Sequence, residues 1–184
     1  MDAKEVLKYY RCDKEIPDMI KLACNMNFQV LNSALNNDSN YNFARATLTT
    51  KRYLNEENNC YKYGDSNLIT LDEFQNFYNM RYAIAYLLSA YILGAKTEKI
   101  FYKLNNLNIE ALYGNAYEIN RIDQFYVNDK NVLLFARDLL IPSELFFNDV
   151  EKGNYDYKSL EEKYLVPDFL LKSKILEFKK NNKI

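Results

Sequence analysis

The stretch Tyr82-Ala-Ile-Ala-Tyr-Leu-Leu-Ser-Ala-Tyr-Ile-Leu-Gly94 decides the fold of this chain. Its apolar side chains cover nearly the whole circumference of a helix, which is typical of a helix enclosed by other elements. The apolar run continues to Ala95, between Arg81 and Lys96, and is shorter than the roughly 20 residues that a membrane span needs. We therefore expect a central helix over residues 82–95, with Ile84, Leu88 and Tyr91 packed in the core, and no membrane partner.

The same stretch has the frame of a metallopeptidase zinc helix without the chemistry of one. A zinc helix of the H-E-x-x-H type carries two imidazoles one turn apart and, between them, a carboxylate that activates the metal-bound water. The corresponding positions hold Tyr86, Leu87 and Ala90, whose side chains can neither bind zinc nor activate water. The chain contains no histidine at any position. We therefore predict no catalytic residue, no metal site and no cofactor.

The composition is that of a folded globular protein. The chain has 184 residues, of which 48% are hydrophobic, and it includes 17 Tyr and 11 Phe. One domain over residues 1–184 is expected from this length. The net charge of −1 gives no attraction for nucleic acid or anionic membrane, so we expect no nucleic-acid partner.

The cysteines and the N-terminus indicate a cytoplasmic protein. Cys12, Cys24 and Cys60 are odd in number and widely spaced, and no C-x-x-C pair occurs. This pattern favours reduced, buried thiols over a zinc knuckle or a disulfide framework. The first residues, Met1-Asp-Ala-Lys-Glu-Val-Leu-Lys8, are charged and lack the apolar core of a secretion signal.

The first half of the sequence predicts one helix followed by a small sheet. Residues 15–36 begin with helical spacing, and Pro17 suits a first helical turn. Alternation of apolar and polar residues over 43–54 predicts a half-buried strand. Further strands are expected at 60–63 and 68–71, which together predict a small three-stranded antiparallel sheet.

The second half predicts a helical bundle, so the fold class is α+β. Asp72 and Glu73 are expected to open the helical region that leads to 82–95, with a break near Asn79. A second strongly apolar helix is expected at 132–140, stopped by Pro142. Other helical segments are predicted at 98–104, 109–117, 143–151, 159–164 and 168–180.

The order of these segments resembles the ImmA/IrrE family of metallopeptidases. In that family a strand leads to an Arg-aromatic-x-Ile-Ala stretch, which is followed directly by the zinc motif H-E-x-G-H. Here the lead-in is matched by Arg81, Tyr82, Ile84 and Ala85. The motif itself is replaced, because its His, Glu, Gly and His positions hold Tyr86, Leu87, Ser89 and Ala90.

Two later blocks also resemble the family, so the likeness extends over about residues 15–180. The segment 129–142 ends in Leu-Leu-Ile-Pro, similar to the family's Leu-Leu-Met-Pro helix end. The family's third zinc ligand is a Glu just before that helix, and Asp129 or Asn131 lies nearest to its position. The segment 160–167 and the following helix resemble the closing pair of helices, although Pro167 stands where the family usually has Ser.

Other catalytic arrangements find little support in the sequence. Asp123, Asp129 and Asp138 suit Mg²⁺ or Ca²⁺ better than zinc, and solvated surface charge is the preferred interpretation. Ser89 lies within an apolar helix, with no histidine to act as its base. The positions Tyr86, Leu87, Ala90 and Asp129 are therefore interpreted as a degenerate former zinc site.

The resemblance implies a zincin-like fold, found in phage and mobile-element regulation, where a member cleaves or binds a repressor. We expect a non-catalytic pseudopeptidase that binds a protein partner such as a repressor or regulator. Two alternatives stay open. One is an enzyme that uses unrecognised Asp, Glu or Tyr chemistry, and the other is a purely structural subunit of a complex.

Overall fold

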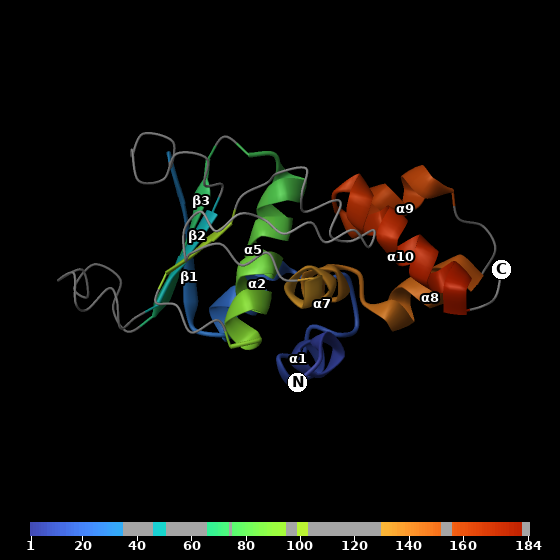
Figure 1. The fold of residues 1–184 in the computed structure, drawn as a ribbon, viewed down its shortest axis with the longest axis horizontal. Helices are drawn as coiled ribbons and strands as arrows, with labels where there is room; N and C mark the ends of the chain where they lie inside the picture. Colours follow the sequence, from blue (N-terminus) through green and yellow to red (C-terminus); the bar gives the residue numbers. More distant parts are fainter. Residues whose placement is uncertain are drawn as a thin grey trace.

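The helix α5 (Phe77–Ile92) lies between a sheet and a group of helices in the computed structural model (Figure 1). It packs against strands on one side and against α7 (Lys130–Leu140) on the other. The structure describes residues 1–34, 46–50, 66–73, 75–94, 99–102, 130–151 and 156–181. Within these ranges the chain is α+β, as the sequence predicts.

The sheet is mixed, so the prediction of an antiparallel sheet is wrong. Its strands are β1 (Phe28–Ser33), β2 (Ala46–Thr49), β3 (Asn67–Asp72) and β4 (Lys99–Tyr102), in the order β1-β3-β2-β4. β1 runs parallel to β3, whereas β2 is antiparallel to both of its neighbours. The described residues thus form four strands instead of three.

Each predicted strand has a different outcome. The strand expected at 68–71 is confirmed as β3, and the strand expected within 43–54 is confirmed at 46–49. All four residues of β2 are buried, so the half-buried interpretation of the alternating pattern is wrong. Its threonines Thr47 and Thr49 are 3% and 6% exposed, so both faces of this central strand are covered. The strand expected at 60–63 lies outside the described residues.

Two strands occur where none was predicted. β1 occupies the second half of the 15–36 segment, and most of its residues are exposed, so its apolar pattern is weak. β4 occupies the segment for which a helical piece at 98–104 was predicted, and that prediction is wrong. Both strands are held by partners distant in sequence. The helical piece expected at 109–117 lies outside the described residues.

The N-terminal part contains two short helices. α1 (Ala3–Tyr9) was not predicted, and it begins with a capping box between Asp2 and Glu5. α2 (Met19–Asn25) confirms the helical first half of the 15–36 segment, with Asp18 as the N-cap, so Pro17 precedes the helix instead of opening it. α1 packs against α7 and α2 against α5.

Helix α5 differs from the prediction at both ends. Asp72 ends β3 and Glu73 lies in a turn, so these two residues do not open the helix. The N-cap is Asn76, whose side chain accepts a hydrogen bond from the backbone N–H of Asn79. The helix then runs without the expected break and ends before Gly94, which has a φ of 85° that suits glycine.

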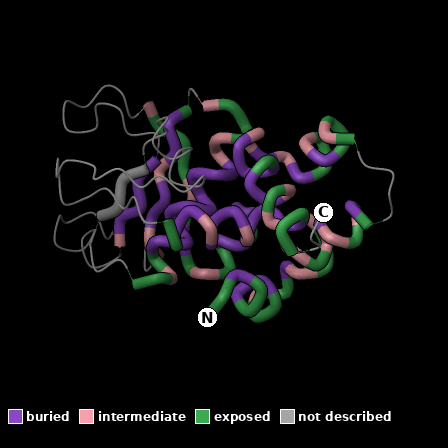
Figure 2. The backbone as a smooth tube through the Cα atoms, turned by 45° about the vertical axis from the view of Figure 1, so that its right-hand side comes forward, coloured by how far each residue is buried: buried purple, intermediate pink, exposed green. Residues whose placement is uncertain are grey.

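The C-terminal helices are confirmed to within two residues at each boundary. They are α7, α8 (Ser143–Glu151), α9 (Tyr157–Tyr164) and α10 (Asp168–Asn181). Figure 2 shows buried residues running through the interior of the molecule and exposed residues along its outer helices. The core is continuous from β2 and β3 through α5 and α7 to α10.

Candidate functional site

The positions of the former zinc motif lie inside the core. The exposed fractions of Tyr86, Leu87 and Ala90 are 3%, 0% and 1%. They fall in the run from Arg81 to Ala90, in which every residue is buried. Because α5 is covered by the sheet and by α7, these side chains belong to the continuous apolar core of the described residues.

Aromatic rings fill the region around Tyr86. Its ring meets the ring of Tyr82 edge to face, with the centroids 6.3 Å apart. Tyr82 in turn meets Phe169 of α10, at a centroid distance of 5.3 Å. Such edge-to-face pairs are favourable arrangements in protein cores. Burial raises the pKa of the Tyr82 hydroxyl well above its usual range, which makes this group a poor acid or base at neutral pH.

The remaining predicted site residues add no metal-binding group among the described residues. Asp129 and Asp123 lie outside the described ranges. In those ranges the structure holds no group of three or more Cys, Asp or Glu side chains that could bind a metal ion. Ser89 is buried and donates a hydrogen bond of 2.6 Å to the carbonyl oxygen of Ala85 in the same helix.

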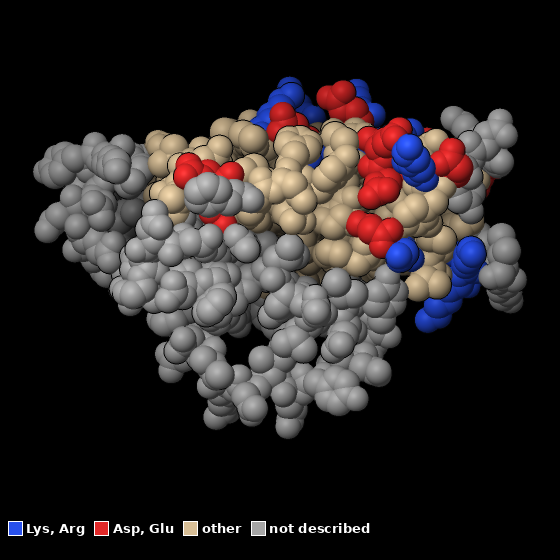
Figure 3. All heavy atoms as spheres, turned by 90° about the horizontal axis from the view of Figure 1, so that it is seen from above, with Lys and Arg blue, Asp and Glu red and all other residues tan. Residues whose placement is uncertain are grey.

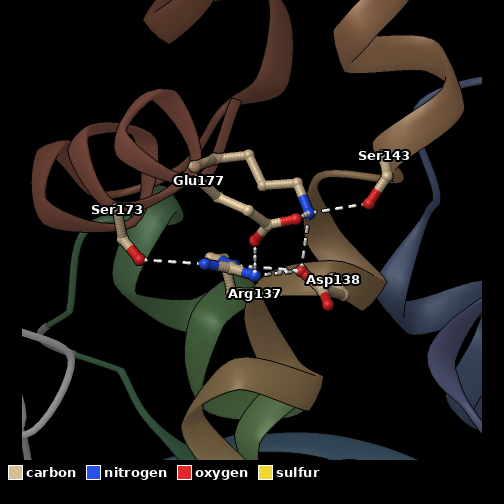
Figure 4. Close-up of polar contacts among 6 residues, drawn as sticks. Arg137, Asp138, Ser143, Ser173 and Glu177 are labelled. Atoms are coloured by element: carbon tan, nitrogen blue, oxygen red, sulfur yellow. Dashed lines mark hydrogen bonds and ion pairs between the residues drawn. The ribbon is translucent and has the colours of Figure 1, made fainter. Parts of the chain in front are cut away.

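Asp138 is part of a cluster of ion pairs, so the prediction that it is solvated surface charge is wrong. The α7–α10 ion cluster consists of Arg137, Asp138, Ser143, Ser173, Lys174 and Glu177 (Figure 4). Lys174 is fully buried and donates to the Asp138 carboxylate at 2.8 Å, to the Ser143 hydroxyl at 2.7 Å and to Glu177 at 3.2 Å. All three N–H groups of this ammonium therefore have acceptors.

The second cation of the α7–α10 ion cluster is Arg137, which is also buried. Its Nε donates to Asp138 at 2.9 Å and its Nη1 to Ser173 at 3.0 Å, while Nη2 pairs with Glu177. Two cations thus face two carboxylates. This balance ties α7 and the start of α8 to α10, and it indicates a structural role because the polar groups satisfy one another.

A recognisable pattern for the ion cluster was present in the sequence but was missed. Arg137 and Asp138 interrupt the apolar helix predicted at 132–140. Lys174 and Glu177 are three residues apart in the predicted helix 168–180, and therefore on one face. Charges of both signs on two helices that also carry core residues are candidates for a buried pairing.

Arg81 connects α5 to two other segments. Its Nη2 donates to the carbonyl oxygen of Pro17 and its Nε to that of Leu165, both at 3.2 Å. Its guanidinium carbon lies 5.9 Å from the centre of the Phe77 ring. Burial lowers the pKa of Arg81, and the nearby Asp18 carboxylate partly opposes this change. The sequence singled out Arg81 only as part of the stretch that resembles the ImmA/IrrE lead-in, and the structure gives it these contacts.

The two described cysteines differ in exposure. Cys12 is buried, as predicted, and its thiol lies 3.4 Å from the carbonyl oxygen of Tyr10. Cys24 is exposed on α2, so the prediction of a buried thiol is wrong there. Cys60 lies outside the described residues.

No family model, no curated protein and no solved structure matches this chain. Among the described helices, none has the length and apolar character required to cross a membrane.

Proposed function

We propose that this chain is a non-catalytic pseudopeptidase of the ImmA/IrrE type that acts by binding a protein partner. The observation that carries the proposal is the burial of Tyr86, Leu87 and Ala90 at the positions where that family has its zinc motif. A hydrolytic site needs a metal-bound water that a substrate can reach, and this region is filled by apolar side chains.

The arrangement of the elements also supports the proposal. β3, α5 and α7 follow one another in the order that the resemblance implies, and α5 packs against both of the others. Arg81 and Tyr82, which match the family's lead-in, are buried and bind the helix to its surroundings. We further propose a cytoplasmic setting in phage or mobile-element regulation, with a repressor or regulator as the partner.

Metal content and peptidase activity test the non-catalytic part. We expect the purified protein, dialysed after exposure to zinc, to retain far less than one zinc per chain by elemental analysis, because imidazole ligands are absent. It should leave an unstructured substrate such as casein intact in the presence of added zinc. About one zinc per chain together with cleavage of casein would overturn the proposal.

Rebuilding the motif is a sharper test of the same point. The triple variant Tyr86→His, Leu87→Glu, Ala90→His places imidazoles and a carboxylate at the motif positions. We expect weak zinc binding at best and no peptidase activity, because the third ligand and its supporting groups are altered too. Leu87→Glu alone should also destabilise the fold, since it buries an unpaired carboxylate.

The binding part is tested in the organism that makes the protein. The chain is tagged, cross-linked in the cell and purified through its tag. We expect one other protein to be recovered with it, uncleaved and in nearly the same molar amount. Recovery of its cleavage products instead would favour an enzyme, and recovery of no stoichiometric protein would contradict a binding function. The core variant Leu88→Asp, which should be strongly destabilised, serves as the control for non-specific capture.

A further inference from the structure

The N-terminal end of α5 combines exposed rings with a buried cation. Phe77 and Tyr78 begin this helix and are 54% and 37% exposed, and their rings lie edge to face with centroids 6.4 Å apart. Arg81, one turn further along, is only 8% exposed. These two rings offer an apolar surface beside the Arg81 guanidinium, and aromatic and arginine side chains are enriched among the residues that dominate binding at interfaces.

Arg81 lacks a carboxylate partner within the described ranges. Its two hydrogen bonds go to uncharged carbonyl oxygens, and its Nη1 has no acceptor among the described residues. The Asp18 carboxylate is close enough to influence Arg81, but its Oδ1 accepts the backbone N–H groups of Ile20 and Lys21 as the N-cap of α2. The Nη1 group of Arg81 is therefore left to donate hydrogen bonds to a carboxylate from outside the chain.

The helix itself adds positive potential at the same place. α5 has 16 residues, and no acidic residue lies in its first turn. The positive end of its dipole is therefore not compensated by a carboxylate within that turn. Figure 1 places this end of α5 at the top of the molecule, and Figure 3, which looks from that side, shows uncharged atoms in the middle of the described surface, with charged side chains at its right and upper edge and acidic side chains at its left.

We infer that Phe77, Tyr78 and Arg81 form a docking site for an acidic segment of a protein partner. A Glu or Asp carboxylate of that segment pairs with the Arg81 guanidinium, and a neighbouring apolar side chain packs on the rings of Phe77 and Tyr78. This inference rests on the proposed protein-binding function and adds the chemistry of the partner. A nucleic acid is disfavoured because phosphate backbones require several cations in a row, and this site offers one.

A random heptapeptide library displayed on phage tests this chemistry with the full chain as bait. We expect the selected peptides to carry Asp or Glu next to an aromatic or aliphatic residue. The best sequence, synthesised with a fluorescent label, should bind the wild-type protein in an anisotropy titration. Replacing its acidic residue by the matching amide should weaken binding about tenfold or more, as loss of a charged pair at an interface does.

Variants of the protein locate the binding. Phe77→Ala removes an exposed ring with little effect on folding and should weaken peptide binding about tenfold. Tyr9→Ala, which removes an exposed ring from α1, should leave binding unchanged. Arg81→Gln should abolish the preference for the acidic peptide over its amide, provided that the circular dichroism spectrum shows a folded variant. If the Arg81→Gln variant is unfolded, the affinity of Phe77→Ala for the peptide and the affinity of wild type for the amide peptide still test the inference.

Several results would overturn the inference. They are a library without acidic enrichment, peptides that bind Phe77→Ala as tightly as wild type, and displacement of the peptide by a single-stranded oligonucleotide. None of these results would touch the zinc and casein tests, so the docking site can fail while the pseudopeptidase proposal stands. Conversely, zinc-dependent cleavage would remove the proposed function whatever the peptides show.

Discussion

At the scale of single residues, the middle and the last turn of α5 behave differently. Ile84 and Leu88 are buried as predicted, whereas Tyr91 is exposed, so its predicted core position is wrong. The ring of Tyr91 still meets that of Phe28, with centroids 5.1 Å apart. The difference follows from position, because the last turn of the helix lies beyond the run Arg81–Ala90, in which every residue is buried.

The substitution Leu88→Asp tests how strongly the middle of α5 depends on its apolar surroundings. We expect a loss of about 4 kcal/mol or more in the free energy of unfolding, because a fully buried carboxylate would have no partner. Urea denaturation followed by circular dichroism measures it. The matched control Leu176→Asp, at an exposed position of α10, should change stability by about 0.5 kcal/mol or less. Similar losses in both variants would contradict the burial of Leu88.

Substitutions of Arg11 test the effect of a left-handed backbone conformation on stability. Arg11 has a φ of 57° and follows Tyr10, the C-cap of α1. Its N–H donates to the carbonyl oxygen of Lys8, and the N–H of Cys12 donates to the carbonyl oxygen of Leu7. This is a Schellman motif with a non-glycine residue in the left-handed position. Arg11→Gly should therefore raise the free energy of unfolding by about 0.5–1 kcal/mol, whereas Arg11→Ala should not. Thermal melts of the two variants measure this difference. Equal melting temperatures of Arg11→Gly and Arg11→Ala would contradict the role of the left-handed conformation.

At the scale of elements, the sequence predicted what local pattern determines. The helices α7 to α10 have apolar spacing and a stop at Pro142, and the structure confirms these four helices. β1 and β4 were missed because their few residues pair with strands far away in sequence, and such pairing leaves no local pattern. The burial of Tyr86, Leu87 and Ala90 could be expected from their apolar neighbours. The charged residues of the α7–α10 ion cluster could be recognised on their two helices, but which of them pair could not, because the pairing depends on how the helices pack.

Lys174 tests what this cluster contributes to the contact between α7 and α10. Lys174→Met keeps most of the length of the side chain but removes the N–H donor to Ser143 and one of the two cations that face Asp138 and Glu177. We expect a loss of about 1–3 kcal/mol in the free energy of unfolding, moderated because Arg137 still pairs with both carboxylates.

The control for this experiment lies on the same helix. Lys172 forms an exposed ion pair with Asp168 at 2.6 Å. Lys172→Met should therefore cost about 0.5 kcal/mol or less. If the two Lys→Met variants had equal stability in urea, the cluster would be neutral to folding and its role would have to lie elsewhere.

At the scale of the whole molecule, buried tyrosines make stability depend on alkaline pH. Burial, and secondarily a hydrogen bond of 2.7 Å to Asp149, raise the pKa of Tyr164 above its usual range. Burial does the same for Tyr82. The folded protein therefore keeps these protons after the unfolded chain has released them. This contribution is complete below the ordinary tyrosine pKa of about 10 and decreases as the pH rises above it.

The double variant Tyr82→Phe, Tyr164→Phe isolates this effect. Between about pH 8 and about pH 11, the wild-type protein should lose more of its free energy of unfolding than the double variant, because phenylalanine has no proton to release. Deprotonation of lysines affects both proteins alike. Urea titrations at the two pH values give the comparison, with Tyr9→Phe as an exposed control that should follow the wild type. Parallel losses in all three proteins would contradict the assignment.

The strand order has a consequence for how the chain is made. Phe28 pairs with Asn67, and Ala46 pairs with Tyr102, so the sheet joins residues that leave the ribosome at very different times. A nascent chain that ends before Tyr102 has already exposed the apolar residues of α5 but has not received the strand that completes the sheet. Pairing between such distant segments is slow, and incomplete chains with exposed apolar surface aggregate. We therefore expect synthesis of this protein to depend on a chaperone that shields the segment 82–92 until β4 has emerged.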